Sequence, residues 1–328
     1  MKLTMEQIAS AAWGVARVVK DEEFVRLCRF TQAQEDFYEV TNEQHYRRSL
    51  GTAGVTMEFD TDSTRLSLDI RCSMGSSRHW FVLSVFVNGQ RIGEMNGKYA
   101  QPGYADAAAT FSLGEGNKRV KLYFPWSSCA RIRSMELDDG AAFEPVVKTG
   151  KVMIFGDSIT QGYDASRPEL SYASQLADYL GADCVNKAIG GEVFRPGLSE
   201  LADDFQPQLI TVAYGTNDWP RRPMEELREN ARQFLANLRG YYPNARIVVL
   251  APVWRKISGE LRLGSSFDAI ATTLKGLVEE MDNAEFIDCI SFIPHDLTVY
   301  SPDGTHPNDS GFAYYGKALT AALRERGI

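Results

Sequence analysis

The pattern of hydrophobic and polar positions divides the chain into two halves. Between about residue 24 and about residue 140, short segments alternate apolar and polar side chains, and long helical patterns are absent. A period of two residues is typical of half-buried strands. These segments are "VTMEFDT" (55–61), "RLSLDIRC" (65–72), "WFVLSVFVNGQRIGEM" (80–95), "ATFSLG" (109–114) and "RVKLYFPW" (119–126). The Asn88-Gly89 pair favours a hairpin turn. We predict an all-β, jelly-roll-like sandwich over residues 1–146, with a short N-terminal helix begun by Thr4.

After "FEPVVKTG" (143–150), apolar strands alternate with amphipathic helices. The predicted strands are "KVMIF" (151–155), "DCVNKA" (183–188), "LITVAYG" (209–215), "RIVVLAP" (246–252) and "EFIDC" (285–289). Apolar residues at helical spacing predict helices over 171–180, over 224–242 and near the C-terminus. Residues 147–328 are therefore expected to form an α/β domain, with a parallel sheet between helices. Ligands of such sheets bind beyond the carboxyl ends of the strands.

Composition narrows the function classes. The net charge of −8 and the absence of a dense basic run argue against nucleic acid and against an anionic membrane surface as partners. No apolar run approaches the ~20 residues that span a bilayer, and the N-terminus lacks the apolar core of a signal peptide. Five scattered cysteines favour free, mostly buried thiols and a cytoplasmic location, although a chain that had lost its leader would look the same.

Ser158 ends the first strand of the second half, in "KVMIFGDSITQGYD" (151–164). An isolated serine between a strand and a helix is most often a helix cap. A phosphate-binding loop is excluded because no G-x-x-x-x-G-K-[ST] pattern is present, and the G-x-G-x-x-G and G-x-S-x-G motifs are also missing. Ser158 therefore needs a base elsewhere in the chain before it can be read as a nucleophile.

"SPDGTHPN" (301–308) offers such a base, because Asp303 lies three residues before His306. A carboxylate at this spacing can orient one ring nitrogen while the other accepts the serine proton. Taken alone, the same residues fit a surface turn, and D-x-x-H can also supply two metal ligands, although no cluster completes a metal site.

An acyl-transfer site also needs hydrogen-bond donors for the developing oxyanion. Gly190 and Gly191 follow the second strand of this half, and Asn217 follows the third. Glycines and Asn-Asp pairs are also common turn residues, so each feature alone is weak. Their occurrence together with Ser158 and His306, each at a strand end or before the last helix, favours a catalytic site.

These four blocks, "GDSIT", "NKAIGG", "GTND" and "DGTHPN", resemble those of the SGNH, or GDSL, hydrolases in their usual order. The resemblance covers residues 151–328 and implies a flavodoxin-like three-layer domain without metal or other cofactor. It implies Ser158 as nucleophile and His306 as base, oriented by Asp303. It further implies an oxyanion hole formed by the Ser158 and Gly191 backbone N–H groups and the Asn217 side chain.

One residue departs from the family pattern. Members often carry Asn-x-Gly-x-x-Gly in the second block, whereas this chain has Ala188 at the middle glycine. We therefore assign the oxyanion role to Gly191 rather than to Gly190. A β-rich half before an SGNH half is similar to the arrangement of carbohydrate esterases that deacetylate polysaccharides, and of some related acyl-transfer enzymes.

The candidate substrate contacts are Asp157, Trp219 and Trp254. The two tryptophans follow strands and can either stack on a sugar or pack in the core. Arg221, Arg222 and Arg255 lie near the same predicted rim, where they meet either a charged substrate or solvent.

Three hypotheses remain open at this stage. The first is an esterase that removes a small acyl group, such as acetyl, from a carbohydrate or related metabolite. The second is an acyltransferase, or a lipase or thioesterase for longer chains, that uses the same residues. The third is a non-catalytic carbohydrate-binding protein. In each case the partner is a small-molecule or carbohydrate ester, and a homo-oligomer is compatible with the sequence.

Overall fold

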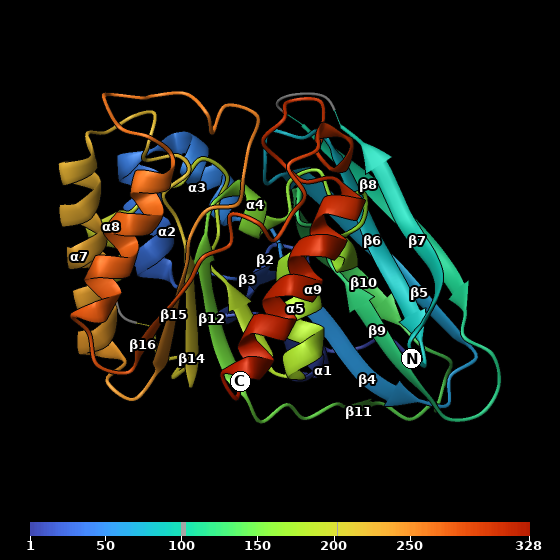
Figure 1. The fold of residues 1–328 in the computed structure, drawn as a ribbon. Helices are drawn as coiled ribbons and strands as arrows, with labels where there is room; N and C mark the ends of the chain where they lie inside the picture. Colours follow the sequence, from blue (N-terminus) through green and yellow to red (C-terminus); the bar gives the residue numbers. More distant parts are fainter. Residues whose placement is uncertain (100–102, 202) are drawn as a thin grey trace. The chain divides into compact units, whose positions relative to one another are not determined.

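A computed structural model of the protein describes residues 1–99, 103–201 and 203–328. The chain divides into two compact units (Figure 1). The first, called the β-unit below, comprises Met1–Thr149 with Arg167–Glu169, and the second, called the α/β-unit, comprises Gly150–Ser166 and Leu170–Ile328. The sequence placed the boundary between residues 146 and 147, close to this division.

The β-unit contains two antiparallel sheets whose strand order is that of a jelly roll. One sheet runs β1-β4-β9-β6-β7, with β11 also on β4, and the other runs β2-β3-β10-β5-β8. Counted from β3 as one to β10 as eight, these orders contain 2-7-4-5 and 1-8-3-6, which is the alternation of two Greek keys. The strands are β1 (Ala12–Trp13), β2 (Arg17–Asp21), β3 (Phe24–Cys28), β4 (Thr56–Thr61), β5 (Arg65–Met74), β6 (Trp80–Val87), β7 (Gln90–Lys98), β8 (Tyr104–Ser112), β9 (Lys118–Tyr123), β10 (Ser128–Glu136) and β11 (Glu144–Pro145).

The apolar members of the alternating segments form one core between these sheets. Met57 and Leu122 come from one sheet, Ile70 and Ile132 from the other, and all four are buried in the same cluster. The β6–β7 hairpin turns at Asn88 and Gly89, whose φ angles of 49° and 78° suit the turn that matches strand twist. The predicted α/β fold class with an N-terminal β-sandwich is confirmed.

Three helices accompany the sandwich: α1 (Met5–Ala11), α2 (Gln32–Thr41) and α3 (Glu43–Ser49). The predicted start at Thr4 is confirmed, because its side chain accepts a hydrogen bond from the Gln7 N–H in a capping box. The prediction that long helical patterns are absent between about residue 24 and about residue 140 missed α2 and α3. The missed signal is a second capping box, formed by Thr31 and Gln34.

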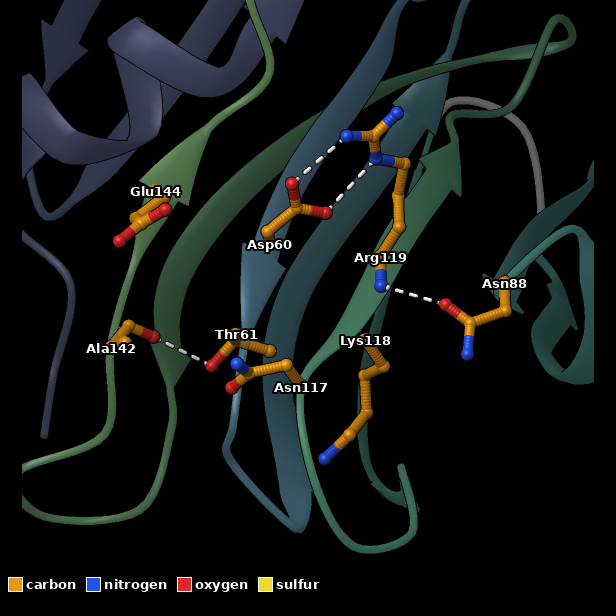
Figure 2. A pocket seen from close by; sticks show the side chains of 8 residues that line it. All are labelled: Asp60, Thr61, Asn88, Asn117, Lys118, Arg119, Ala142 and Glu144. Carbon is orange, nitrogen blue, oxygen red and sulfur yellow. Dashed lines mark hydrogen bonds and ion pairs between the residues drawn. The ribbon is translucent and has the colours of Figure 1, made fainter.

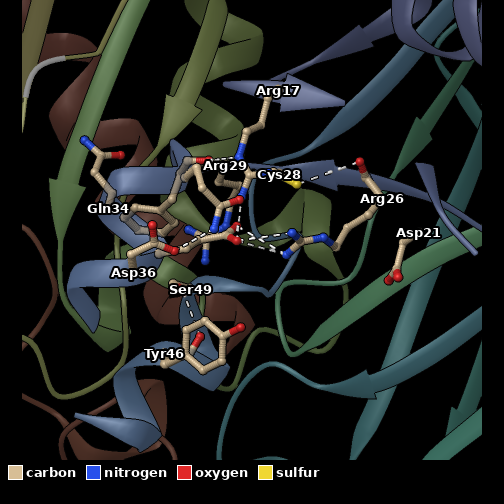
Figure 3. Close-up of polar contacts among 12 residues, drawn as sticks. Arg17, Asp21, Arg26, Cys28, Arg29, Gln34, Asp36, Tyr46 and Ser49 are labelled. Atoms are coloured by element: carbon tan, nitrogen blue, oxygen red, sulfur yellow. Dashed lines mark hydrogen bonds and ion pairs between the residues drawn. The ribbon is translucent and has the colours of Figure 1, made fainter. Parts of the chain in front are cut away.

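A buried carboxylate ties α2 to the neighbouring strands of the β-unit. The Glu35 side chain is 2% exposed, and it forms ion pairs with Arg17 at 2.5 Å and with Arg26 at 3.1 Å (Figure 3). A buried charge of this kind is tolerated only when paired, so removal of either partner would cost far more than an exposed ion pair contributes.

The β-unit also has a polar cavity of about 500 Å³ near the ends of β4, β9 and β11. Asp60 and Arg119 line it, and their side chains bind each other through two hydrogen bonds of 2.9 Å. The backbone N–H of Arg119 donates a further hydrogen bond to the Asn88 side chain (Figure 2). Asp60 and Arg119 therefore satisfy each other.

The α/β-unit is built on a parallel sheet in the order β13-β12-β14-β15-β16, which is the flavodoxin-like order 2-1-3-4-5. Its strands are β12 (Lys151–Gly156), β13 (Asp183–Asn186), β14 (Leu209–Ala213), β15 (Arg246–Leu250) and β16 (Ala284–Ile287). The buried, continuous apolar strands Val152–Phe155 and Ile247–Leu250 are those expected of a sheet covered on both faces.

Helices cover the two faces of this sheet, with α7 and α8 on one side and α5 and α9 on the other (Figure 1). The helical elements are α4 (Ser158–Gln161), α5 (Tyr172–Leu180), α6 (Pro196–Ser199), α7 (Met224–Tyr241), α8 (Asp268–Glu279), α9 (Asp309–Glu325) and the 3₁₀ turns Pro168–Leu170 and Leu297–Val299. Strand order reverses at β12, so the loops after β12, β13 and β14 meet at one edge, where such sheets bind ligands.

All five cysteines are free and buried, as predicted. None of the helices in the described part of the chain is both long enough and apolar enough to cross a membrane.

Candidate active site

Ser158 stands at the carboxyl edge of the sheet because β12 ends at Gly156 and a helix begins at once. Asp157 caps this helix, since its side chain accepts a hydrogen bond of 2.9 Å from the Ile159 N–H. Gly156 has to lack a side chain, because a Cβ at this position would overlap the Thr160 side chain. The tight strand-to-helix turn places the Ser158 hydroxyl at the edge of the sheet, with 7% of the residue exposed.

A continuous hydrogen-bond chain joins Ser158, His306 and Asp303. The Ser158 Oγ lies 2.7 Å from His306 Nε2, and His306 Nδ1 lies 2.6 Å from Asp303 Oδ2. An ionised carboxylate only accepts hydrogen bonds, so Nδ1 carries the proton. In the neutral ring Nε2 is then an acceptor, and the Ser158 hydroxyl donates to it.

The environment of Asp303 keeps this carboxylate ionised. Burial raises its pKa, but hydrogen bonds from the His306 side chain and from the His306 and Thr305 N–H groups outweigh burial and hold the pKa well below its usual range. The two backbone bonds, of 3.0 Å and 2.9 Å, also fix the loop that carries the histidine. Asp303 therefore both orients His306 and can stabilise its protonated form.

The pKa of Asp157 is shifted upwards, in the direction opposite to that of Asp303. The complete burial of Asp157 raises its pKa to about 6, although the Ile159 N–H, the protonated form of His306 and the positive charges of Arg255 and Arg221 oppose this rise. Asp157 is thus engaged as a helix cap beside the serine. The substrate contact that the sequence suggested for Asp157 stays a prediction.

The three predicted oxyanion donors come from the three adjacent loops. Among the described residues, the N–H groups of Ser158 and Gly191 have no hydrogen-bond acceptor, which leaves both available to a ligand. The Asn217 side chain donates one hydrogen bond of 3.1 Å to the Glu192 carbonyl and keeps a second N–H. Gly190, by contrast, spends its N–H on the Gln161 side chain at 2.7 Å, so the choice of Gly191 is compatible with the geometry.

Two residues near the serine helix, which sequence reasoning missed, hold the histidine. The Tyr163 ring stacks on the His306 ring with centroids 5.3 Å apart, and Asp164 Oδ2 lies 3.8 Å from His306 Nδ1. Asp164 adopts a left-handed φ of 70°. Gly190 packs against Tyr163 so closely that a Cβ would lie 2.5 Å from the tyrosine hydroxyl oxygen. The sequence shows these residues beside the GDS block but does not show which side chain meets His306.

The loop after β14 is held from within by Asp218. This buried carboxylate accepts from the Phe194 N–H at 3.2 Å and pairs with Arg222 at 3.3 Å. Burial raises its pKa to about 7, against the influence of Arg222 and the Phe194 N–H. Asp218 therefore links the loop of Asn217 to the loop of Gly191.

The stacking role suggested for Trp219 is wrong. This side chain is fully buried, its Nε1 donates to the Ser265 carbonyl at 2.9 Å, and its ring meets Phe267 edge to face. A tryptophan directly after Asn217-Asp218 packs inward because the loop turns back at that point through the Trp219 N–H to Gly215 carbonyl bond. Burial also depends on the distant loop that contains Ser265 and Phe267, which the sequence does not reveal.

Trp254 is partly exposed and stacks on His295, with ring centroids 5.1 Å apart. Its carbonyl accepts a hydrogen bond from the Tyr300 hydroxyl at 2.8 Å. Tyr300 also leads into the loop of Asp303 and His306, so Trp254 stays a candidate for a substrate contact.

Asp164, Asp303 and His306 bring ligand atoms within 4.8 Å of one another, a spacing at which a metal ion could be held. The Asp303–His306 hydrogen bond of 2.6 Å already occupies two of these atoms. A cation there would compete with the proton that the hydrogen bond requires, so the cluster fits the histidine-orienting role better than a metal centre. The absence of a metal or cofactor stays a prediction.

Comparison with known proteins agrees with this site. Residues 154–314 match the model of the GDSL-like lipase/acylhydrolase family. A GDSL esterase/lipase of Arabidopsis thaliana is 26% identical over 215 residues, which cover 54% of this chain and 87% of the plant protein.

Solved structures share the fold over both units. The salicylyl-acyltransferase SsfX3 of a tetracycline biosynthetic pathway has a TM-score of 0.84 at 20% identity and covers 97% of this chain and 94% of its own. A GDSL-like lipase from Bacteroides ovatus has a TM-score of 0.77 at 18% identity, with coverages of 99% and 97%. A family two carbohydrate esterase from Clostridium thermocellum, in complex with cellohexaose, has a TM-score of 0.67 at 17% identity, with coverages of 84% and 93%.

At these identities the structural similarities establish the fold, whereas the family model and the plant relative carry the sequence relationship. Residues 154–314, just under half of the chain, are similar to the GDSL-like lipase/acylhydrolase family, in agreement with a serine hydrolase of the SGNH type that acts on esters.

Proposed function

We propose that this protein hydrolyses a small O-acyl ester, such as an acetyl ester on a carbohydrate or related metabolite, through an acyl-enzyme on Ser158. The observation that carries the proposal is the hydrogen-bond chain from Asp303 through His306 to Ser158, with links of 2.6 Å and 2.7 Å. Both links lie within the range expected for a nucleophile and its base.

In the proposed reaction the Ser158 Oγ attacks the ester carbonyl carbon while its proton passes to His306 Nε2. The carbonyl oxygen becomes an oxyanion that accepts hydrogen bonds from the Ser158 and Gly191 N–H groups and from the Asn217 side chain. His306 then returns the proton to the alcohol oxygen as the C–O bond breaks, which leaves the acyl group on Ser158. Water activated by the same histidine releases the acid and restores the serine.

Asp303 contributes by holding the Nδ1 proton and by stabilising the imidazolium that forms in each half of the reaction. The low pKa of this carboxylate supports the assignment, because it stays ionised wherever the histidine can act as a base. Tyr163 supports the same ring by stacking on it.

The carbohydrate preference rests on the similarity to family two carbohydrate esterases and to an acetyl xylan esterase from Butyrivibrio proteoclasticus, which has a TM-score of 0.62. The burial of Trp219 removes one of the two aromatic platforms expected from the sequence. Trp254 is then the remaining candidate for stacking on a sugar.

An acyltransferase is the second candidate, and a specific observation favours it. The salicylyl-acyltransferase matches 97% of this chain with a TM-score of 0.84, a closer fit over the whole chain than the carbohydrate esterases give. Both activities use the same acyl-enzyme, and the only difference is whether water or an alcohol accepts the acyl group.

The test is hydrolysis of 4-nitrophenyl esters of increasing acyl length, with Ser158→Ala as the control for uncatalysed hydrolysis. We expect short acyl chains to react fastest and activity to vanish in Ser158→Ala. Wild-type rates in that variant would overturn the nucleophile assignment. A strong preference for long chains would replace the proposal by a lipase or thioesterase.

A second step separates hydrolysis from transfer and tests the carbohydrate preference. Release of acetate from acetylated sugars is measured with and without added alcohol acceptors. An acceptor that diverts most of the acyl group from water would favour the transferase. No release from any acetylated sugar would remove the carbohydrate assignment but leave the esterase intact.

A further inference from the structure

Two arginines at the catalytic edge, Arg221 and Arg255, form no ion pair with any residue that the structure describes. Elsewhere arginines are commonly paired, as in Arg133 with Asp69 at 2.7 Å and Arg246 with Glu285. In a chain with a net charge of −8, two uncompensated guanidinium groups near one site are conspicuous. Their positions show what they face.

Arg221 lies over the loop that carries Gly191. Its Nη1 donates to the Gly191 carbonyl at 2.8 Å, and the rest of the exposed side chain remains open to solvent. A guanidinium has five N–H donors, so this one bond leaves most of them available. Arg221 therefore adds positive charge beside the residue proposed to bind the oxyanion.

Arg255 lies against the loop that carries Asn217. Its Nη1 donates to the carbonyl and hydroxyl oxygens of Thr216, both at 3.1 Å, while its Nε is buried and without an acceptor. The guanidinium carbon also lies 5.9 Å from the centre of the buried Trp219 ring. One of its three guanidinium nitrogens is thus fixed to the loop, and the described residues offer no hydrogen-bond acceptor to the other two.

The segment of Arg255 is anchored to the histidine loop. The Lys256 N–H donates to the Gly304 carbonyl at 2.8 Å, and Gly304 follows Asp303 directly. The Tyr300 hydroxyl donates to the Trp254 carbonyl at 2.8 Å. These bonds hold Arg255 beside the triad rather than on a loop free to swing away.

The positive charges of both arginines act on the carboxylate next to the nucleophile. Both arginines act to lower the pKa of Asp157, the residue before Ser158, and Asp303 counteracts the lowering of the Arg255 pKa that burial causes. The acidic groups in range are already engaged, because Asp157 caps α4 and Asp303 binds His306. Apart from the proposed oxyanion donors, the unused capacity for an anion at this edge is therefore on the arginines.

We propose that Arg221 and Arg255 form an anion-binding subsite, so that the preferred substrate is an ester that carries a carboxylate or phosphate a few bonds from the scissile carbonyl. Arginine suits both anions because its planar N–H fork binds their oxygens in pairs. The inference rests on the proposed esterase activity of Ser158 and names the substrate class for that site.

The test compares esters that differ in charge but little in size. For an anion on the acyl side, mono-4-nitrophenyl glutarate is matched with 4-nitrophenyl pentanoate. For an anion on the alcohol side, 4-acetoxybenzoate is matched with 4-acetoxybenzamide. The rate with Ser158→Ala is subtracted in each case, because the glutarate ester also hydrolyses without enzyme.

We expect kcat/KM to favour the anionic member of at least one pair by about tenfold or more, as one charge interaction near a partly buried site supplies. The pair that shows the preference tells whether the anion lies on the acyl or the alcohol side. Arg221→Gln and Arg255→Gln should each reduce the ratio several-fold, and the double variant should bring it near one. Arg255→Lys should keep part of it.

The ratio of the two members, rather than either rate, is the readout, because glutamine variants also disturb the loops of Gly191 and Asn217. Arg324→Gln is the matched control for loss of one positive charge. Arg324 lies in the last turn of α9, about 25 Å along the helix from the histidine loop, so the ratio should not change.

Two results would overturn the inference: equal kcat/KM for both members of each pair in the wild type, or an unchanged ratio in the double variant. Loss of all Ser158-dependent hydrolysis would instead overturn the proposed function. In that event, calorimetric binding of glutarate and 4-hydroxybenzoate to Ser158→Ala still tests the subsite. Binding that Arg255→Gln does not weaken would reject it.

Discussion

A paired carboxylate of the β-unit and two buried carboxylates of the α/β-unit have pKa values shifted in opposite directions. In the β-unit, Asp106 is bound by Arg71, and that hydrogen bond lowers its pKa to about 2. In the α/β-unit, burial raises the pKa of Asp157 to about 6 and that of Asp218 to about 7, while Arg221 and Arg255 have no ion-pair partner among the described residues. In these examples the charge in the β-unit is stabilised by an ion pair, whereas the charged groups at the catalytic edge are buried or lack an ion-pair partner among the described residues.

This contrast locates the catalytic site better than the presence of a cavity does. A cavity of about 500 Å³ in the β-unit is lined by Asp60 and Arg119, which satisfy each other. The edge of the parallel sheet instead holds a buried carboxylate, unpaired cations and free N–H donors within one group of loops. Perturbed charges with unused bonding capacity are characteristic of functional sites.

The largest difference between the two units is expected when one histidine in each is replaced by asparagine. His306→Asn should lower kcat by about 10⁴-fold or more, because the base for Ser158 is lost. His79→Asn in the β-unit, where the ring lies 6.2 Å from Tyr99, should stay within a few-fold of wild type. The measurement is steady-state kinetics on a short 4-nitrophenyl ester. A kcat of more than a tenth of the wild-type value in His306→Asn would contradict the assignment of His306 as the base.

A second exchange adds one methyl group to a tightly packed glycine in each unit. In Gly190→Ala the new Cβ would lie 2.5 Å from the Tyr163 hydroxyl oxygen, and Tyr163 stacks on His306. We expect kcat to fall by about 10- to 100-fold, because a small displacement of a catalytic group is costly. The free energy of unfolding should fall by about 1–3 kcal/mol.

Gly97→Ala in β7 is the matched control, because its Cβ would lie 2.8 Å from the Phe81 ring. A similar loss of stability with unchanged kcat is expected, since Phe81 belongs to the sandwich core. Equal kcat losses in both variants would show that general destabilisation, rather than the position of His306, explains the effect.

Asp157 and Asp106 should contribute to stability with opposite dependence on pH. Asp157 has a raised pKa of about 6, so the folded state holds a proton that the unfolded state releases near pH 4. Its contribution to the free energy of unfolding is therefore lost as pH rises from about 4 to about 6, by up to about 3 kcal/mol. For Asp106, whose pKa is lowered to about 2, stability is lost instead as pH falls below about 4.

Asp157→Asn sharpens this contrast, because asparagine keeps the cap oxygen but cannot ionise. Hydrogen exchange of the β12 and β14 amides between pH 4 and 7, corrected for intrinsic rates, should show a flatter pH dependence in the variant. Protection in β5 and β8 should be unaffected. An unchanged pH dependence in the α/β-unit would mean that Asp157 does not carry the raised pKa.

The smallest effect is expected at the cavity of the β-unit. Arg119→Gln removes an ion pair whose partners are 50% and 41% exposed, so chemical denaturation should show a loss of about 1 kcal/mol or less. Ester hydrolysis should not change. A large loss of activity would mean that the paired charges of this hollow take part in function after all.

The sequence alone is enough to predict those features of the fold and the site that depend on a local pattern of residues. The apolar run 151–155 and the turn at Gly156-Asp157 identify a buried strand that ends at Ser158, and Asp303 three residues before His306 suggests the orienting pair. Alternation also revealed β4 to β9. The helices α2 and α3 were missed because their apolar positions are few, although Thr31 and Gln34 form a capping box.

What the sequence could not supply are contacts between distant segments. Nothing local shows that Tyr163 stacks on a histidine 143 positions later, or that Arg255 binds the Thr216 carbonyl. The burial of Trp219 likewise depends on the loop that contains Ser265. Such pairings are set by the tertiary packing of loops at the sheet edge rather than by the period of any one segment.

The central claim, that Ser158 is a nucleophile activated by His306, is tested most directly by covalent labelling. A fluorophosphonate reacts with an activated serine by releasing fluoride, and peptide mass mapping then locates the adduct. We predict a single modified serine, Ser158, in the wild-type protein, and a labelling rate reduced by at least about 10³-fold in His306→Asn. An adduct on a different residue, or equal labelling of Ser158 in His306→Asn, would contradict the account.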